Sequence, residues 1–274
     1  MISIILPTYN NEKTIFYSIK SILNQSYRNF ELIIINDFST DKTKQVIHSF
    51  NDSRIIYIEN EKNIGGTKSI IRGIEIAKGD YIARMDGDDI AMPERLEIQL
   101  NYLTDNPDID LVGSNIILFA DNKVIGSSNL KLYNSNNINF YMRTLGLPHP
   151  TWMTKTEFFR NFEYNPSIIV AQDQDLLLRA NNFCQYALLK KPLLFVRIPE
   201  KINVKYKLKQ VFNLLIARIN YLNSAKLFYY YPLILIAFIR SVFLYIFSLR
   251  KIDWEIITNL NSKYQTLLDE IRKN

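Results

Sequence analysis

The alternation of strand and helix patterns in the first 120 residues constrains the fold more than any other feature of the sequence. Apolar, β-branched runs predict buried strands at residues 2–6, 32–35, 55–58, 81–83 and 111–118. Apolar residues recur at helical spacing over residues 12–24, 40–50 and 67–77. Because strands that alternate with helices usually pair in parallel through helical crossovers, we predict an α/β fold with a Rossmann-like, doubly wound, mostly parallel sheet.

Polar clusters follow the first four predicted strands. They are Thr8-Tyr9-Asn10, the segments 36–41 and 60–66, and Asp86-Gly87-Asp88-Asp89. In doubly wound sheets, ligands bind beyond the carboxyl ends of the strands. The sequence therefore predicts a ligand site that is assembled from these four segments.

The carboxylates of Asp86, Asp88 and Asp89 are the strongest chemical signal in the chain. Three carboxylates this close repel one another unless a cation or water offsets their charge. Their oxygens suit hard ions such as Mn²⁺ or Mg²⁺, which commonly bridge a phosphate-bearing substrate. Gly87 leaves room for the backbone to approach a ligand. The alternative interpretation is a solvated acidic turn before a helix that starts at Pro93.

Four further residues are candidates, and each has an ordinary structural alternative. Asp37 can accept hydrogen bonds from a nucleobase or ribose, or it can form an Asx turn. Lys68, at the start of a helix, can reach a diphosphate or stay solvated. Asp173 is placed as a general base or as a helix cap. His149 can touch an acceptor or be an ordinary loop residue.

Six segments together resemble the inverting family 2 glycosyltransferases of the GT-A type, which assemble bacterial surface glycans. They are residues 3–10, 35–41, 63–65, 77–89, 148–150 and 173–179. The resemblance covers residues 1–200, and it rests on the order and spacing of the segments together. It implies the transfer of one sugar from a nucleotide diphosphate sugar to an acceptor hydroxyl.

The family pattern implies a role for each matching residue. The nucleotide-sugar site would consist of Pro7, Thr8, Tyr9, Asp37, Lys68, Asp86, Gly87 and Asp89. Within this set Asp37 would bind the base, usually uracil. Asp88 would hold the metal ion, Mn²⁺ or Mg²⁺, and Asp173 would be the catalytic base. His149 is assigned to the acceptor side.

Several positions depart from the family pattern. Asn36 replaces one of two paired acidic residues, and Phe38 replaces the glycine of the same turn. Gln172 replaces the usual Glu before the catalytic base, and the loss of that negative charge favours an ionised Asp173. Residues 196–199 lack the His that approaches the metal in many members, so we expect metal affinity or loop closure to differ.

Charge divides the chain at residue 200. Residues 1–200 carry 21 Lys and Arg against 23 Asp and Glu, and residues 201–274 carry 12 against 4, so the net charges are −2 and +8. This distribution does not fit a general nucleic-acid binder. We predict a catalytic domain over residues 1–200 and a basic, apolar helical region over residues 201–274.

The C-terminal region has three interpretations. Lysines beside apolar and aromatic residues favour an interfacial helix on an anionic membrane, which would bring the enzyme to a lipid-linked acceptor. The alternatives are packing on the catalytic domain or on a second copy, which would give a homo-oligomer, and a membrane span, which Arg240 interrupts. Because Cys184 is the single cysteine and no signal peptide is evident, we expect a cytoplasmic protein, peripheral on the inner face of the cell membrane.

Two other functions fit parts of the pattern. A nucleotide-sugar-binding protein without catalysis would keep the donor residues but would not need Asp173. A sugar-phosphate nucleotidyltransferase shares the general architecture. Such enzymes usually carry a Gly-rich loop with Arg and Lys after the first strand, where this chain has Pro7-Thr8-Tyr9-Asn10-Asn11.

Overall fold

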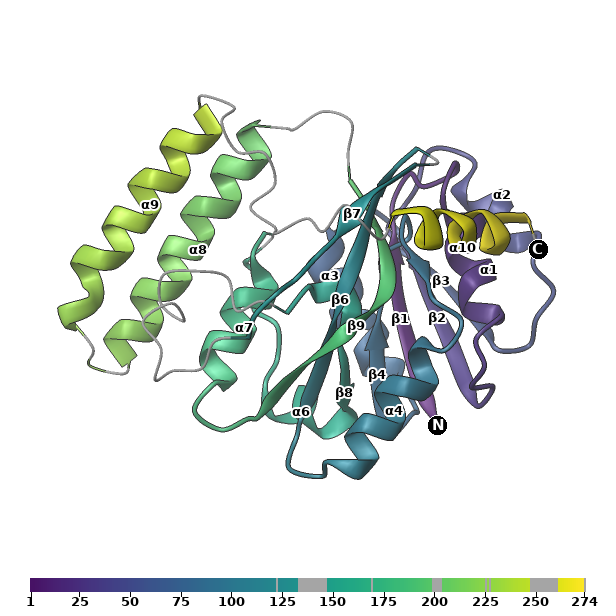
Figure 1. Ribbon diagram of the computed structural model, residues 1–274, viewed down its shortest axis with the longest axis horizontal. Coiled ribbons are helices and arrows are strands. Elements are labelled where there is room, and N and C mark those ends of the chain that lie inside the picture. The colour runs from purple at the N-terminus through teal and green to yellow at the C-terminus, as the bar shows by residue number, and fades with distance from the viewer. Residues whose placement is uncertain are drawn as a thin grey trace.

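One mixed sheet forms the centre of the molecule (Figure 1). The computed structural model describes residues 1–121, 123–132, 147–168, 170–198, 204–224, 226, 228–246 and 261–273. Within these residues the sheet has nine strands in the order β3-β2-β1-β4-β8-β6-β9-β5, with β7 paired to β6. The strands are β1 (Ile2–Thr8), β2 (Phe30–Asn36), β3 (Ile55–Glu59), β4 (Tyr81–Arg84), β5 (Ile90–Ala91), β6 (Leu111–Ala120), β7 (Lys123–Ser127), β8 (Met153–Lys155) and β9 (Tyr186–Arg197).

The predicted class and elements are confirmed. The five predicted strands are β1, β2, β3, β4 and β6, and the three predicted helices are α1 (Ile15–Leu23), α2 (Thr43–His48) and α3 (Gly66–Ile76). Strands β1 to β4 pair in parallel. Strand β8 is antiparallel to both β4 and β6, and β9 is parallel to β6. The β1–β4, β6 and β9 strands therefore all run the same way, which makes the sheet mostly parallel.

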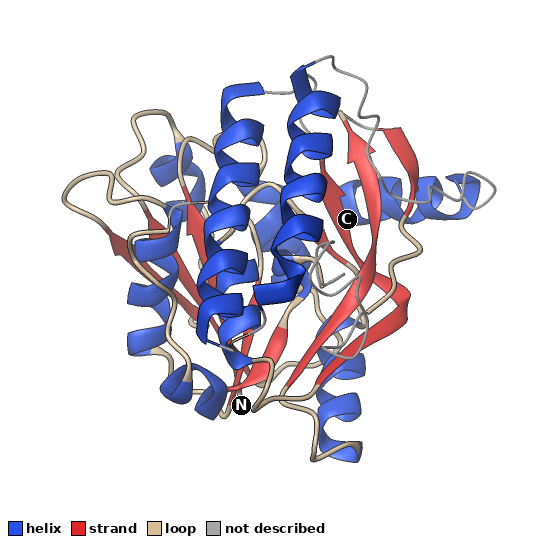
Figure 2. Ribbon diagram, turned by 90° about the vertical axis from the view of Figure 1, so that its left-hand side faces the viewer, coloured by secondary structure: helices blue, strands red, loops and turns tan. Residues whose placement is uncertain are grey.

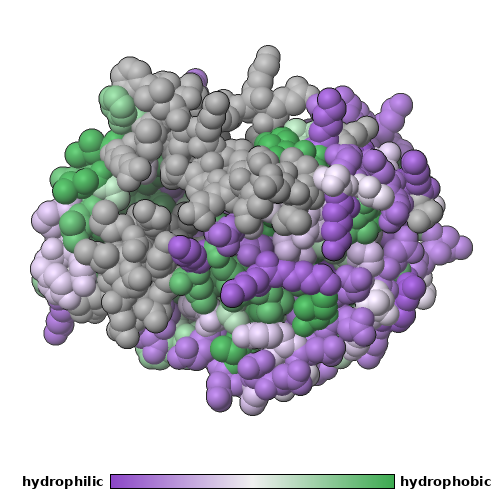
Figure 3. Space-filling view, in the orientation of Figure 1, coloured by the Kyte–Doolittle hydropathy of each residue, from purple (hydrophilic) through white to green (hydrophobic). Residues whose placement is uncertain are grey.

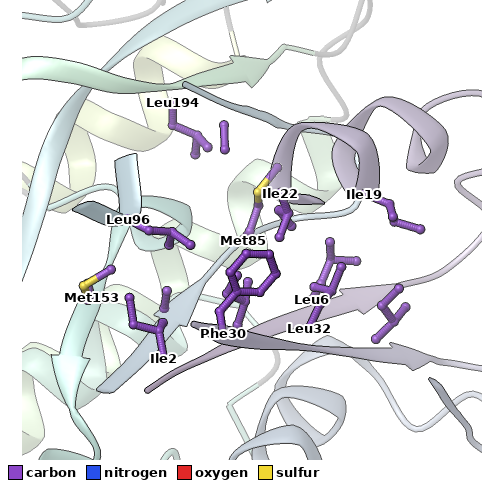
Figure 4. Close-up of a cluster of buried hydrophobic side chains, with 14 of the residues drawn as sticks. Ile2, Leu6, Ile19, Ile22, Phe30, Leu32, Met85, Leu96, Met153 and Leu194 are labelled. Atoms are coloured by element: carbon purple, nitrogen blue, oxygen red, sulfur yellow. The ribbon is translucent and has the colours of Figure 1, made fainter. Parts of the chain in front are cut away.

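Both faces of the sheet are buried, because successive side chains of a strand point to opposite faces. Ile2, Ile4 and Leu6 of β1 pack with α1, α2 and α4 (Arg95–Asp105) on one face (Figure 4). Ile5 of the same strand packs with α3, α6 (Thr156–Asn161) and α7 (Gln172–Ala180) on the other face. Burial on both faces explains why these strands are mostly apolar along their whole length rather than alternating between apolar and polar residues.

The C-terminal helices lie on two different sides of the sheet (Figures 1 and 2). Helices α8 (Val204–Ser224) and α9 (Tyr231–Ile246) lie side by side, joined by a short 3₁₀ turn (Phe228–Tyr230), and α8 packs on α7. Helix α10 (Asn261–Lys273) packs on β7, where Leu268 joins Phe119 and Phe195 in a small apolar cluster. None of the helices in the described ranges is long and apolar enough to cross a membrane. The predicted domain boundary at residue 200 lies outside the described residues.

Candidate functional site

The turns that follow β1 and β2 are tied together by hydrogen bonds. The backbone N–H of Asp37 donates to the carbonyl of Thr8 at 2.8 Å. The backbone N–H of Asn10 donates to Ser39 Oγ at 3.0 Å. Parallel pairing of Thr8 with Asn36 brings these turns to the same edge of the sheet, as expected for a site at the strand ends.

The residues predicted to line the nucleotide pocket differ in exposure. Pro7 is half-buried, and the buried Thr8 hydroxyl donates to Asn11 Oδ1 at 2.9 Å. Tyr9 and Phe38 present their rings on the adjoining turns, and each is 47% exposed. Phe38 has a φ of 61°, so it occupies the left-handed region in which the family's glycine is favoured. Contact of these residues with a nucleotide stays a prediction.

Asp37 organises the loop that follows β3. Its Oδ1 accepts hydrogen bonds from Asn60 Nδ2 at 2.7 Å and from the Ile64 N–H at 2.8 Å. Its Oδ2 accepts a hydrogen bond from the Gly65 N–H at 2.8 Å. Asp37 does not form the alternative Asx turn, because its carboxylate oxygens accept hydrogen bonds from the loop after β3. In the turn itself, Asn36 Oδ1 accepts hydrogen bonds from the N–H and the hydroxyl of Ser39. Binding of the base by Asp37 stays a prediction, and its carboxylate is already engaged in holding the loop.

The same loop leads into α3, where Lys68 lies exposed in the first turn. Gly65 precedes the helix with a φ of 89°, a conformation that L side chains rarely adopt. The hydrogen bonds that Asp37 accepts from the Ile64 and Gly65 N–H groups therefore set the position at which α3 begins and from which the Lys68 side chain extends. A contact between Lys68 and a diphosphate stays a prediction.

Arg84 is a buried cation beside the carboxylate cluster. Its Nη1 lies 2.5 Å from Asp86 Oδ1, an ion pair without the alignment of a hydrogen bond. The charge of Asp86 raises the pKa of Arg84 against the opposing effect of burial. Arg84 is not among the predicted site residues. An arginine at the end of an otherwise apolar strand, two residues before an aspartate, is the signal that could have identified it.

Gly87 allows the carboxylate turn to pack closely against the turn after β1. A Cβ atom on Gly87 would lie 2.9 Å from Thr8 Oγ1 and 3.1 Å from Asn11 Oδ1. The carbonyl of Gly87 also accepts a hydrogen bond from Thr14 Oγ1 at 3.0 Å. The small residue is thus required for packing within the protein, and the predicted approach to a ligand stays a prediction.

Asp88 and Asp89 occupy different environments. Burial, together with repulsion from Asp86, raises the pKa of Asp88 to about 6. Asp89 is buried, and burial followed by repulsion from Asp88 and Asp86 raises its pKa well above the usual range. Asp89 Oδ1 accepts a hydrogen bond from the Arg197 N–H at 3.0 Å. Arg197 Nε donates to the carbonyl of Asp88 at 3.3 Å, so an arginine braces this turn near the segment in which many family members have a histidine.

Asp173 lies in the first turn of α7 and is half-buried. Gln174 Nε2 donates to Asp173 Oδ2 at 3.2 Å. The alternative role as a helix cap is wrong, because Ala171 occupies the N-cap position. Burial raises the pKa of Asp173 and outweighs the hydrogen bonds that favour its charged form. This direction is opposite to the one expected from Gln172 alone.

Tyr164 lies within electrostatic range of both Asp86 and Asp173. Burial raises its pKa, and the charges of Arg84, Asp173 and Asp86 all act on its hydroxyl. Asp173 therefore shares one neighbourhood with the end of β4, although the two lie far apart in the sequence. Tyr164 is not among the predicted site residues, and no local pattern distinguishes it.

His149 lies behind this neighbourhood. It is 8% exposed, its Nε2 lies 2.7 Å from Tyr164 Oη, and its ring packs edge-on against Trp152. Burial lowers the pKa of His149 well below the usual range, with a smaller effect from Arg84. The described contacts of His149 are internal, and its predicted contact with an acceptor stays a prediction.

The chemistry of the carboxylates after β4 is suited to a cation that also binds a phosphate group of a substrate. In the part of the chain that the structure describes, no three His, Cys, Asp or Glu side chains converge into a metal-binding cluster. Mg²⁺ is commonly held by one or two carboxylates together with the phosphates of a substrate. Asp88, repelled by Asp86 and partly desolvated, has the chemistry for such binding, because a cation would stabilise its charged form.

Comparison with known proteins identifies the class of this protein. Residues 3–166 match the family described as Glycosyl transferase family 2, and the chain belongs to that family. An uncharacterized glycosyltransferase from Methanocaldococcus jannaschii is 34% identical over 218 residues, which cover 77% of this chain and 75% of the relative. The β-1,3-glucosyltransferase WfgD from Escherichia coli is 36% identical over 126 residues, which cover 46% of this chain and 49% of the relative.

Solved structures agree with the GT-A fold. The crystal structure of residues 1–349 of TarS from S. aureus in complex with UDP superposes with a TM-score of 0.62. The match covers 99% of this chain and 91% of the TarS chain at 18% sequence identity. The predicted family and fold are therefore confirmed, and the protein is a glycosyltransferase.

Proposed function

We propose that this chain transfers one sugar from a UDP-sugar to a hydroxyl of a glycan or lipid-linked acceptor, with inversion at the anomeric carbon. The observation that carries the proposal is the position of Asp173 in the first turn of α7, within electrostatic range of Arg84. A proton acceptor there is close to the strand end at which ligands bind in such sheets. The name of WfgD includes UDP-Glc and a diphosphoundecaprenol-linked acceptor, and TarS crystallised with UDP-GlcNAc, which supports these substrate classes.

The proposed reaction is a single displacement. Asp173 accepts the proton of the acceptor hydroxyl while the acceptor oxygen bonds to the anomeric carbon, and the bond from that carbon to the diphosphate breaks. The raised pKa of Asp173 makes it a stronger base than an exposed carboxylate. General-base assistance of this kind accelerates reactions by roughly 10²–10⁴-fold.

Asp88 is proposed to hold Mn²⁺ or Mg²⁺ together with the donor. A bound divalent cation would offset the negative charge that grows on the leaving diphosphate. Arg84 neutralises part of the charge of Asp86, so the site repels an incoming diphosphate less than three free aspartates would. Tyr9, on the turn after β1, and Lys68, in the first turn of α3, are exposed and available to the nucleotide.

The test compares the wild-type protein with Asp173→Asn and with a control, Glu157→Gln, on the exposed side of α6. UDP release is measured from a panel of UDP-sugars with Mn²⁺ and a lipid-linked acceptor. Asparagine keeps the shape of the side chain but does not accept the proton, so we expect kcat to fall by roughly 10²–10⁴-fold. Asp88→Ala should abolish turnover while the protein stays folded.

Two results would contradict this proposal. Near-normal turnover by Asp173→Asn would remove the assignment of the base. A wild-type protein that binds UDP-sugars but never releases UDP would support the alternative of a nucleotide-sugar-binding protein without catalysis.

Peripheral attachment to a membrane is the second part of the proposal. The outward surface of the helix pair, which we call the α8–α9 face, consists of Phe212, Ile216, Leu235, Ile236, Ile239 and Phe243, each at least half exposed. Apolar side chains gather at the left edge of the molecule in Figure 3, where α9 lies in Figure 1. The exposed Lys205 and Lys209 precede Phe212 and Ile216 at helical spacing, so they share one stripe of α8. Apolar and basic groups on one surface favour anionic lipid.

Vesicle flotation tests this attachment. Ile236→Glu combined with Ile239→Glu should prevent flotation with phosphatidylglycerol vesicles, whereas Phe183→Glu, on an exposed turn after α7, should float like the wild type. Failure of the wild-type protein to float would remove the lipid interpretation. A dimer that light scattering detects in the wild type but not in the double variant would favour self-association through the α8–α9 face.

A further inference from the structure

The segment that leads into α7 is held in a conformation that its residues do not favour. Ala171 has a φ of 66°, in the left-handed region that non-glycine residues rarely adopt. Asp173 follows two residues later, in the first turn of the helix. A strained backbone of this kind persists only where the surrounding structure determines it. The contacts of this segment therefore decide where Asp173 lies.

Two side chains from distant parts of the chain hold the carbonyls of the segment. Thr67 Oγ1, in the first turn of α3, donates to the carbonyl of Ile168 at 3.0 Å. Asn213 Nδ2, on α8, donates to the carbonyl of Val170 at 3.0 Å. Val170 is 3% exposed, so its carbonyl has little access to water as a substitute partner.

Helix α8 contacts α7 along its length. Ala217, Tyr221 and Leu222 pack in the same apolar cluster as the leucines of α7. Tyr221 Oη donates to Asn182 Oδ1 at 3.4 Å, just beyond the end of α7. Asn213 lies at the opposite end of this contact, at the segment before α7. The inner face of α8 thus braces α7 at both ends, while Phe212 and Ile216 on the same helix are exposed.

We propose that Asn213 is a positioning residue for Asp173. Its amide fixes the Val170 carbonyl, and that bond holds the left-handed turn at Ala171 from which α7 and Asp173 start. The inference rests on the proposed role of Asp173 as the base. It also gives the C-terminal helix a part in the reaction that is separate from any contact with a membrane.

Asn213→Ala removes the donor, and Asn213→Asp keeps the shape but presents a carboxylate that repels the Val170 carbonyl. The matched control is Asn220→Ala, which changes the same residue type at an exposed position of α8. The measurements are UDP affinity by calorimetry, and kcat for the nucleotide sugar that the wild type turns over, normalised to folded protein. A displacement of about 1 Å costs roughly 10²-fold in rate, so we expect kcat to fall 10- to 100-fold in both variants. UDP affinity should stay within about twofold, because Asn213 does not lie at the strand ends.

Hydrogen exchange gives a second readout that does not need activity. The Asp175 N–H donates to the Ala171 carbonyl at 3.1 Å, and this amide should exchange faster in Asn213→Ala than in Asn220→Ala. Unchanged exchange together with unchanged kcat would overturn the inference. If Asn213→Ala lowered the melting temperature but left kcat per folded protein normal, Asn213 would stabilise the fold without positioning Asp173. If Asp173→Asn were fully active, the assignment of Asp173 as the base would be wrong. The hydrogen-exchange result would still decide whether Asn213 holds the left-handed turn at Ala171.

Discussion

Arg84 and Asp86 form an ion pair at the carboxyl end of β4, with Nη1 of the arginine 2.5 Å from Oδ1 of the aspartate. The arginine side chain is 8% exposed and the aspartate side chain 38%. The arginine therefore lies in the interior of the protein, while the aspartate that it pairs with is accessible to solvent at the candidate site. It also sets how much negative charge Asp86, Asp88 and Asp89 present together.

Replacing Arg84 with methionine should lower the free energy of unfolding. The change keeps an unbranched side chain but removes the buried cation that pairs with Asp86. Breaking a buried pair costs about 3–5 kcal/mol, and the exposure of Asp86 reduces this to about 1–3 kcal/mol. Urea unfolding measures the loss. The control is Lys191→Met, which breaks an exposed pair with Glu94 and should change stability by less than about 0.5 kcal/mol. Equal effects of both changes would contradict the role of Arg84.

His149 should make the protein sensitive to acid. Its pKa is lowered by burial, so the unfolded chain takes up a proton below about pH 6.5 while the folded protein does not. The stability that this group contributes is present above that pH and is lost as the pH falls. Between pH 7 and pH 5 the loss is about 2 kcal/mol, and His149→Gln should remove it. Urea titrations at both pH values, with His48→Gln on α2 as the control, measure the difference. Identical pH dependence in wild type and His149→Gln would show that the ring takes up its proton in the folded state.

Phe38→Gly should raise the stability of the protein. The residue has a φ of 61°, and glycine adopts this conformation without the steric cost of a Cβ atom. The gain is partly offset by the greater entropy of glycine in the unfolded chain, so we expect about 0.5–1 kcal/mol. Phe38→Ala removes the ring but keeps Cβ, and it serves as the control in thermal unfolding. If alanine stabilised as much as glycine, the ring and not the backbone would be the cause.

Asp37→Asn should loosen the loop after β3. The carboxylate accepts hydrogen bonds from the Ile64 and Gly65 N–H groups, and an amide supplies a second donor where an acceptor is needed. The expected cost is about 1–3 kcal/mol, with faster hydrogen exchange at both amides. Asp52→Asn, which weakens a pair with Arg54 elsewhere on the surface, is the control. Lost UDP binding with normal exchange at Ile64 and Gly65 would instead favour direct contact with the base.

The strands that the sequence predicts correspond to runs of residues that are mostly apolar and contain no lysine or proline. Strand β9 is not predicted, because Lys190, Lys191 and Pro192 break its apolar pattern in the middle. The sheet accepts them because the pairing of β9 with β6 shifts register beside Pro192, opposite Asn115. Asn115 Nδ2 then donates to the Lys190 carbonyl at 3.1 Å. The local sequence around β9 does not reveal this hydrogen bond, because Asn115 lies 75 residues earlier in the chain.

The same limit applies to the candidate site. The spacing of Asp86, Asp88 and Asp89 is visible in four consecutive residues, and it locates the end of β4 correctly. Tyr164 and Asn213 act through partners that lie far away in the chain, and neither belongs to a recognisable motif. Residues whose role depends on tertiary contacts therefore appear only in the folded structure.

The position of α10 has a consequence for how the protein is made. The Val124 N–H on β7 donates to Gln265 Oε1 on α10 across 141 residues of sequence, and Leu268 completes the apolar cluster at that edge of the sheet. At typical synthesis rates of about 5–20 residues per second, the ribosome needs roughly 7–28 s to reach α10 after β7. During that interval Phe119 and Ile117 lack part of their cover, so the nascent chain carries an open apolar edge that a chaperone can recognise.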